Sequence, residues 1–222
     1  MRIRVRSYGT VPAEYLALGD SYTIGEGVED DARWPLQLSA ALRARGVAVT
    51  HPHIIARSGW TTDELIDALE YERSQGQLRE AYGLVSLQVG VNNQYRSRPV
   101  DEFASQYGYL LAAAIRLAGG DPQHVLAVSI PDWGVTPFGV ARGRDRAQVA
   151  REIDAFNAAA AEECARRKVV FVDVTDLSRD PGLAHALVAD GLHPSGEMYA
   201  RWTERIVAAM DPTDDAPNPS AG

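Results

Sequence analysis

Short apolar runs alternate with longer segments of helical periodicity along almost the whole chain of 222 residues. Strands separated by helices pair in parallel, because each crossover helix runs back along the sheet and the next strand begins at the same end as the previous one. The alternation therefore predicts a three-layer α/β/α domain with about five parallel strands. The predicted strands are residues 15–18, 47–55, 84–90, 125–130 and 169–174, and the predicted helices are residues 34–45, 100–117, 147–167 and 195–210, with one more starting at Thr61.

Turn and capping residues mark several of the predicted helix ends. Pro35 stands in the first turn of a helix that stops at Gly46, and Thr61 and Glu64 have the spacing of a capping box. A loop rich in glycine and proline is expected at residues 131–143. With no internal repeat and no second domain, the predicted organisation is an N-terminal extension (1–12), one domain (13–210) and an unstructured tail (211–222) rich in Pro and Asp.

The composition excludes several classes of protein. Hydrophobic residues are 45% and charged residues 23%, which excludes a disordered or fibrous chain, and the chain is long enough to build its own core. The net charge of −8 argues against nucleic acid or an anionic membrane surface as a partner, because both bind cationic proteins. No apolar stretch reaches the roughly 18 residues of a membrane span. The N-terminus alternates arginine with aliphatic residues and lacks the apolar core of a secretory signal, which predicts a cytoplasmic protein.

Motifs for metals and nucleotide cofactors are absent from the sequence. Cys164 is the only cysteine, so the chain can form neither an intramolecular disulfide nor a cysteine-based zinc site. No segment fits GxxxxGK[ST], and the Gly25-Glu26-Gly27 that could open a GxGxxG run has Asp30 in place of the third glycine. We therefore expect neither a metal nor another cofactor.

Four of the five histidines have contexts that favour a structural or surface role. His51 and His53 share one face of a predicted strand, but no acidic or cysteine residue stands nearby to complete a metal site. His124 precedes a predicted strand, and His185 lies in an apolar, helix-like segment, residues 183–187. Neither has a neighbouring motif.

The fifth histidine follows a carboxylate in a short turn, Asp190-Gly191-Leu192-His193-Pro194. Gly191 can adopt positive φ and Pro194 can open a helix, so the turn can aim both functional side chains the same way. Asp190 could then hold one ring nitrogen of His193 while the other nitrogen faces a nucleophile. The pentapeptide by itself is equally compatible with an ordinary Asp-Gly turn before a helix.

Polar residues follow several of the predicted strands. Ligands of open parallel sheets bind at the carboxyl ends of the strands, so these residues are expected to share one rim. Each has a structural interpretation when it is taken alone: Ser21 as a turn residue or helix cap, and Asn92 as a loop-capping side chain. The segments concerned are Gly19-Asp20-Ser21, Arg57-Ser58-Gly59, Gly90-Val91-Asn92-Asn93 and Pro131-Asp132-Trp133.

Four elements occur together and in order, which changes this interpretation. They are Gly19-Asp20-Ser21-Tyr22-Thr23, Gly59, Gly90-Val91-Asn92 and Asp190-x-x-His193. In this combination the chain resembles the SGNH hydrolases, also called GDSL-type esterases and lipases, over residues 15–206. The resemblance implies a flavodoxin-like fold, in agreement with the alternation above. It also implies catalytic residues Ser21 (nucleophile), His193 (base) and Asp190 (orienting carboxylate), and an oxyanion hole formed by Ser21, Gly59 and Asn92.

These residue types suit acyl transfer. A serine at its ordinary pKa is a poor nucleophile and needs a base that is itself oriented, and the tetrahedral oxyanion needs donors fixed in place beforehand. Two positions depart from the family pattern. Thr23 stands where Ser or Leu is frequent, and Asn93 where Asp is frequent, but neither carries a chemical role.

The resemblance predicts a serine esterase that hydrolyses small acyl or acetyl esters, such as a lysophospholipid or an acetylated carbohydrate, through an acyl-enzyme. Its partner would be a small-molecule ester. Two alternatives stay open: an acyltransferase with the same triad, which hands the acyl group to an alcohol, and a catalytically silent α/β binding module. Trp133 and Phe138 are candidate apolar walls for the substrate, although both could instead pack their loop onto the sheet, an interpretation that is favoured for Phe138.

Overall fold

The computed structural model describes residues 2–6 and 11–210, and the predicted C-terminal tail lies outside these residues. Within them, five parallel strands form one sheet in the order β2-β1-β3-β4-β5. The prediction of a three-layer, flavodoxin-like α/β fold is confirmed. The strands are β1 (Tyr15–Gly19), β2 (His53–Ala56), β3 (Leu84–Gln88), β4 (Val125–Val128) and β5 (Val170–Val172).

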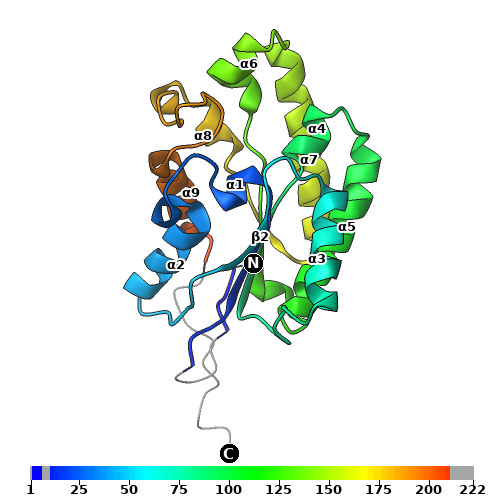
Figure 1. The fold of residues 1–222 in the computed structure, drawn as a ribbon, viewed down its shortest axis with the longest axis vertical. Coiled ribbons are helices and arrows are strands. Elements are labelled where there is room, and N and C mark those ends of the chain that lie inside the picture. Colours follow the sequence, from blue (N-terminus) through cyan, green and yellow to red (C-terminus); the bar gives the residue numbers. More distant parts are fainter. Residues whose placement is uncertain (1, 7–10, 211–222) are drawn as a thin grey trace, which may run out of the picture.

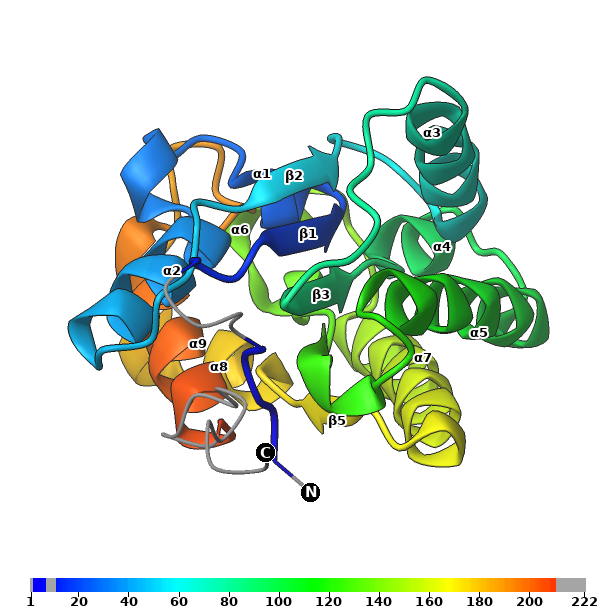
Figure 2. The same cartoon turned by 90° about the horizontal axis from the view of Figure 1, so that it is seen from below.

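Helices cover both faces of the sheet, as Figure 2 shows in a view along the layers. The helices on one face are α2 (Trp34–Ala44), α8 (Thr175–Arg179) and α9 (Gly196–Ala208), and those on the other are α3 (Thr62–Ser74), α4 (Val91–Tyr95), α5 (Val100–Leu117) and α7 (Arg146–Arg167). Two short helices, α1 (Ser21–Ile24) and α6 (Pro137–Ala141), lie beyond the carboxyl ends of the strands (Figure 1).

The core follows from the sequence of the strands. All residues of β1, β3 and β4 are buried, because helices pack on both faces and leave no solvated side. The three tryptophans that are fully enclosed, Trp34, Trp133 and Trp202, lie in the helical layers and in the loop after β4. Within the described residues, no helix combines the length and the apolarity needed to cross a lipid bilayer.

The expected second strand is shorter than predicted. Residues 47–55 contain Pro52, which has no N–H for a ladder hydrogen bond, and regular pairing with β1 begins only at His53. His51 therefore lies outside β2, and the two histidines do not form a pair on one strand. Before the proline, Val49 makes a single bridge to Ala13.

The loop after β4 is more ordered than its composition predicts. It contains a 3-10 turn, η3 (Trp133–Val135), and α6 (Pro137–Ala141), in which the Thr136 hydroxyl accepts a hydrogen bond from the Gly139 N–H. Proline in the first turn and a threonine cap favour such a helix start. The remaining 3-10 turns are η1 (Asp30–Ala32), η2 (Pro122–His124) and η4 (Pro181–Leu183).

Residues 2–6 of the predicted N-terminal extension (1–12) pack against the domain. Ile3 and Val5 are buried in the core, and Ile3 pairs with Met210 just after α9. The Arg6 N–H donates to the carbonyl oxygen of Gly83, immediately before β3. These contacts lie at the amino ends of the strands.

Candidate active site

Ser21 lies where β1 passes into α1. Asp20 caps this short helix, since its carboxylate accepts a hydrogen bond from the Tyr22 N–H at 3.0 Å. Tyr22 is buried against Trp202 of α9, and its ring lies 5.6 Å from that of His193. The helix cap and the buried tyrosine fix the serine at the carboxyl end of β1.

A continuous set of hydrogen bonds joins Asp190, His193 and Ser21. Asp190 Oδ2 lies 2.6 Å from His193 Nδ1, and His193 Nε2 lies 3.0 Å from Ser21 Oγ. The carboxylate beside Nδ1 favours the tautomer with its proton on that nitrogen, which leaves Nε2 free to accept the serine proton. The structure thus brings together three side chains that the sequence places in two motifs 172 residues apart.

The turn that was predicted around Asp190 holds this geometry. Asp190 Oδ1 accepts hydrogen bonds from the backbone N–H groups of Leu192 (2.8 Å) and His193 (2.9 Å). Burial acts to raise the pKa of Asp190, but the hydrogen bonds from the His193 side chain and from both backbone groups outweigh it and lower that pKa below its ordinary value. The carboxylate therefore stays charged beside the imidazole.

Asn92 and Gly59 line the same cavity as Ser21 and His193. Asn92 is in the first turn of α4, and its side-chain N–H₂ donates to the carbonyl oxygen of Trp60 at 2.9 Å. One amide hydrogen is used in this way and the other is left for a ligand. Arg96 donates to the carbonyl oxygen of Gly59 at 2.7 Å and so holds the neighbouring loop.

The cavity around Ser21 has a volume of about 350 Å³. Both aromatic residues that were predicted as walls line it: Trp133, which is 2% exposed, and the half-buried Phe138. The Trp133 indole N–H donates to Gln94 Oε1 at 2.7 Å, so this residue also anchors its loop. The sequence analysis gave no role at the site to several further lining residues, namely Tyr22, Glu26, Ser58, Val91, Tyr95 and Leu192.

Some of these missed residues carry a signal in the sequence. Tyr95 is three residues after Asn92, and residues at that spacing share one face of a helix. Ser58 adjoins Gly59, and Glu26 is flanked by two glycines five residues after Ser21. None of these signals is specific without the fold, because each also fits an ordinary turn or surface position.

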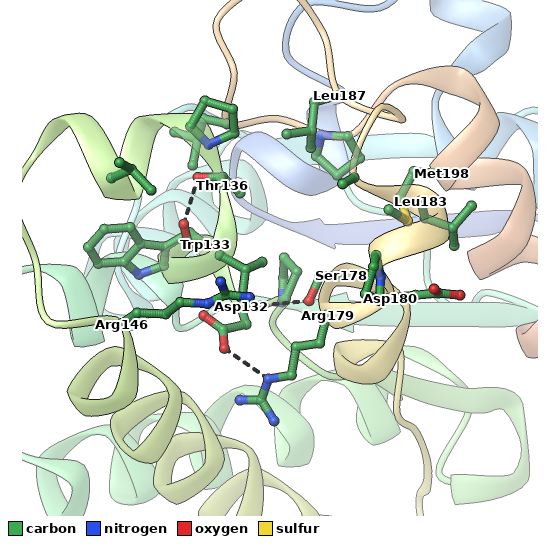
Figure 3. Close-up of a pocket in the computed structure, with 18 of the residues that line it drawn as sticks. Asp132, Trp133, Thr136, Arg146, Ser178, Arg179, Asp180, Leu183, Leu187 and Met198 are labelled. Carbon is green, nitrogen blue, oxygen red and sulfur yellow. Dashed lines mark hydrogen bonds and ion pairs between the residues drawn. The ribbon is translucent and has the colours of Figure 1, made fainter.

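A second cavity, of about 630 Å³, adjoins the first and shares Tyr22, Trp133 and Leu192 with it. Figure 3 shows that the loop after β4 and the segment from α8 to α9 surround it, with the Asp132–Arg179 ion pair on one side. Although larger and mostly apolar in its lining, this cavity contains neither Ser21 nor His193. Ser21 and His193 both line the smaller cavity.

The other histidines lie away from the triad. His53 Nδ1 is 3.3 Å from the Tyr82 hydroxyl, and His124 Nδ1 is 3.1 Å from the Arg4 carbonyl oxygen. His185 is exposed, lies beyond η4 and not in a helix, and pairs with Glu197 at 3.3 Å. The structure thus brings only His193 to the polar rim of the sheet.

Comparison with known proteins agrees with this geometry. Residues 17–201 match the model of the GDSL-like lipase/acylhydrolase family. The chain belongs to this family. It is therefore a serine hydrolase of carboxylic esters, and the resemblance to SGNH hydrolases is confirmed.

Solved structures of GDSL hydrolases share the fold. TesA has a TM-score of 0.68 at 20% identity, over 90% of this chain and 98% of that one. The psychrotrophic esterase EstA from Pseudoalteromonas sp. has a TM-score of 0.64 at 16% identity, over 89% and 96% of the two chains. A mutant of Axe2, an acetyl-xylooligosaccharide esterase from Geobacillus Stearmophilus, has a TM-score of 0.66 at 18% identity, over 98% and 100%. No curated protein sequence matches the chain.

Proposed function

We propose that this GDSL hydrolase cleaves small acyl or acetyl esters through an acyl-enzyme formed on Ser21. The observation that carries the proposal is the unbroken line of hydrogen bonds from Asp190 through His193 to Ser21. In such a line the histidine accepts the serine proton as the hydroxyl attacks, and the carboxylate stabilises the imidazolium that forms.

The first half of the reaction ends with release of the alcohol. Ser21 Oγ bonds to the ester carbonyl carbon, and the carbonyl oxygen becomes an oxyanion that accepts hydrogen bonds from the Ser21 N–H, the Gly59 N–H and the Asn92 amide. Collapse of this intermediate breaks the bond to the alcohol oxygen, which takes the proton from His193 Nε2. The acyl group stays on Ser21.

The second half repeats these steps with water. His193 Nε2 takes a proton from the water as its oxygen bonds to the acyl carbon, and the same donors hold the oxyanion. Breakage of the bond to Ser21 Oγ releases the carboxylic acid and returns the proton to the serine.

The size of the site favours a small acyl group. A volume of about 350 Å³ is at the lower end of the range for small-molecule sites, and Trp133, Phe138 and Tyr95 supply its apolar surface. The structural relatives include an acetyl-xylooligosaccharide esterase and a phospholipase A1. We accordingly propose an acetylated carbohydrate or a lysophospholipid-like ester as the substrate class.

Two measurements test the proposal together. A fluorophosphonate probe should label the wild-type protein and leave Ser21→Ala unlabelled, whereas the control Ser74→Ala, at the exposed end of α3, should be labelled like the wild type. On a panel of esters from acetyl to dodecanoyl, kcat/KM should be highest for the shortest acyl groups. Labelling of Ser21→Ala, or residual hydrolysis within tenfold of the wild type, would overturn the assignment.

A further inference from the structure

Glu26 brings a second carboxylate to His193, on the nitrogen opposite Asp190. Its Oε2 lies 3.7 Å from His193 Nε2 and accepts a hydrogen bond from the Ser58 hydroxyl. Glu26 and Ser58 both line the cavity that contains Ser21. The side chain of Glu26 is 43% exposed, so the carboxylate faces the open part of this cavity and not the core.

The backbone around Glu26 fixes this position. Gly25 and Gly27 have φ angles of 69° and 83°, a left-handed conformation that glycine adopts without strain. The Glu26 N–H donates to the carbonyl oxygen of Ser21 at 3.0 Å. Gly27 packs so closely on Val188 that an added Cβ would lie 2.8 Å from a methyl carbon. The backbone that carries this carboxylate is therefore anchored both to the serine and to the segment that leads to Asp190.

The direction of proton transfer identifies the part of the substrate that meets Glu26. His193 Nε2 gives its proton to the departing alcohol oxygen, which must come within hydrogen-bond distance of that nitrogen. The carbonyl oxygen of the ester lies instead with the donors Gly59 and Asn92. A carboxylate 3.7 Å from Nε2 therefore lies beside the alcohol part of the ester.

Apart from His193, the described part of the chain places no cationic side chain against Glu26. Among the described residues, no arginine or lysine lies within ion-pair distance of its carboxylate. Arg96 binds Glu64 and the Gly59 carbonyl oxygen, and Arg142 and Arg144 lie over aromatic rings of the cavity wall. A bound alcohol group is therefore close to the negative charge of Glu26.

We propose that Glu26 is a specificity-determining residue that selects the alcohol part of the substrate by charge. It favours cationic alcohols over neutral ones and rejects anionic ones. One unit charge at about 6 Å, with an effective dielectric constant of about 40, changes a rate about tenfold in either direction. The inference rests on the proposed function, and within it favours an uncharged carbohydrate ester over a phosphate-bearing lysophospholipid.

Three acetate esters that differ only in the alcohol test this proposal. They are acetylcholine, its uncharged isostere 3,3-dimethylbutyl acetate, and the acetyl ester of 2-hydroxyethanesulfonate, which carries a negative charge. In the wild type we expect kcat/KM to fall about tenfold from the cationic to the neutral ester, and about tenfold again to the anionic one. In Glu26→Gln both ratios should approach one.

Two further variants separate this effect from changes in net charge or folding. Glu29→Gln removes an exposed charge that does not line the cavity, so it should keep the wild-type ratios. Ser58→Ala keeps the Glu26 charge but removes its anchor, so it should give intermediate ratios even if Glu26→Gln does not fold. Wild-type ratios in both Glu26→Gln and Ser58→Ala overturn the proposal. Absence of Ser21-dependent turnover on all three esters would instead overturn the proposed function itself.

Discussion

At the residue scale, Asn92 is the side-chain donor that we propose for the oxyanion. One of its side-chain N–H groups is held by the Trp60 carbonyl oxygen, which fixes the direction of the other. Such a donor acts mainly in the transition state, because the substrate carbonyl carries much less charge than the oxyanion.

Replacing Asn92 with alanine is therefore expected to lower kcat by about 10²–10³-fold and to leave KM nearly unchanged. Steady-state kinetics on a short-chain ester measures both parameters. An increase in KM alone would make Asn92 a substrate-binding residue and remove it from the oxyanion hole.

Asp20, next to the candidate nucleophile, is fully buried, and its Oδ2 has no hydrogen-bond partner among the described residues. Burial raises the pKa of this carboxyl to about 7, and hydrogen bonds from the backbone N–H groups of Tyr22 and Gly90 offset only part of the increase. The unfolded chain loses this proton near pH 4 and the folded protein near pH 7, so folding takes up a proton between these values. Stability then falls as the pH rises through this window, by at most about 1.4 kcal/mol per pH unit.

Asp20→Asn removes this titration and keeps an oxygen acceptor for the two N–H groups. Relative to the wild type, the variant should therefore gain free energy of unfolding between pH 4.5 and pH 8. Urea denaturation at several pH values measures the difference, with the exposed Asp31→Asn as a control that should show none. A stability difference independent of pH would mean that Asp20 has no raised pKa.

At the scale of secondary-structure elements, α4 and the start of α3 are joined through Asn93. Its Oδ1 accepts a hydrogen bond from the Thr62 N–H at 3.1 Å, and its N–H₂ donates to the Thr62 hydroxyl at 2.7 Å. Thr62 is the first residue of α3. Asn93 thus satisfies a buried backbone donor that the helix cannot pair within itself.

Asn93→Ala should lower the free energy of unfolding by about 1–3 kcal/mol, because it leaves the Thr62 N–H without a partner inside the protein. Its neighbour Asn92→Ala should leave stability much closer to the wild type. Denaturant unfolding of the two variants side by side distinguishes a structural asparagine from a functional one. Equal stability of Asn93→Ala and the wild type would contradict this division.

At the scale of the whole molecule, the candidate active site and the buried N-terminal segment lie at opposite ends of the strands. The triad lies at the carboxyl ends of the strands, while Ile3 packs at the opposite end, where its N–H donates to the carbonyl oxygen of Ala209 at 3.2 Å. Helix α9 begins three residues after His193 and spans its 13 residues, about 20 Å, before reaching that contact.

Ile3→Ala should therefore destabilise the protein without affecting catalysis. Truncation of a fully buried isoleucine costs about 2–5 kcal/mol, which thermal unfolding would show as a lower Tm, while kcat/KM measured well below that Tm should equal the wild-type value. Unchanged stability would show that residues 2–6 contribute little to the core. A specific loss of kcat at low temperature would instead show coupling between the two ends of the sheet.

The sequence by itself determined the longer helices and strands, because these elements are long enough for their hydrophobic periodicity to be visible. The helix over residues 100–117 was predicted with both of its observed ends, and the capping-box spacing of Thr61 and Glu64 corresponds to the observed start of α3, where the Thr61 N–H donates to Glu64 Oε2. Helices α4, α6 and α8, with five residues each, are too short to show a helical period and become visible only in the packed structure.

For the candidate site, too, the sequence predicted one part and the tertiary structure decided the rest. The motifs around Ser21, Gly59, Asn92 and His193 identify residue types, because the chemistry of acyl transfer restricts which side chains can serve. The distance between Ser21 and His193 cannot be predicted from their positions in the sequence. The same holds for the contact between Glu26 and the imidazole of His193. Both distances are set by the strand order and by the packing of loops at the carboxyl ends of the strands. Strand order and loop packing depend on contacts between segments far apart in the chain, so only the tertiary structure decided them.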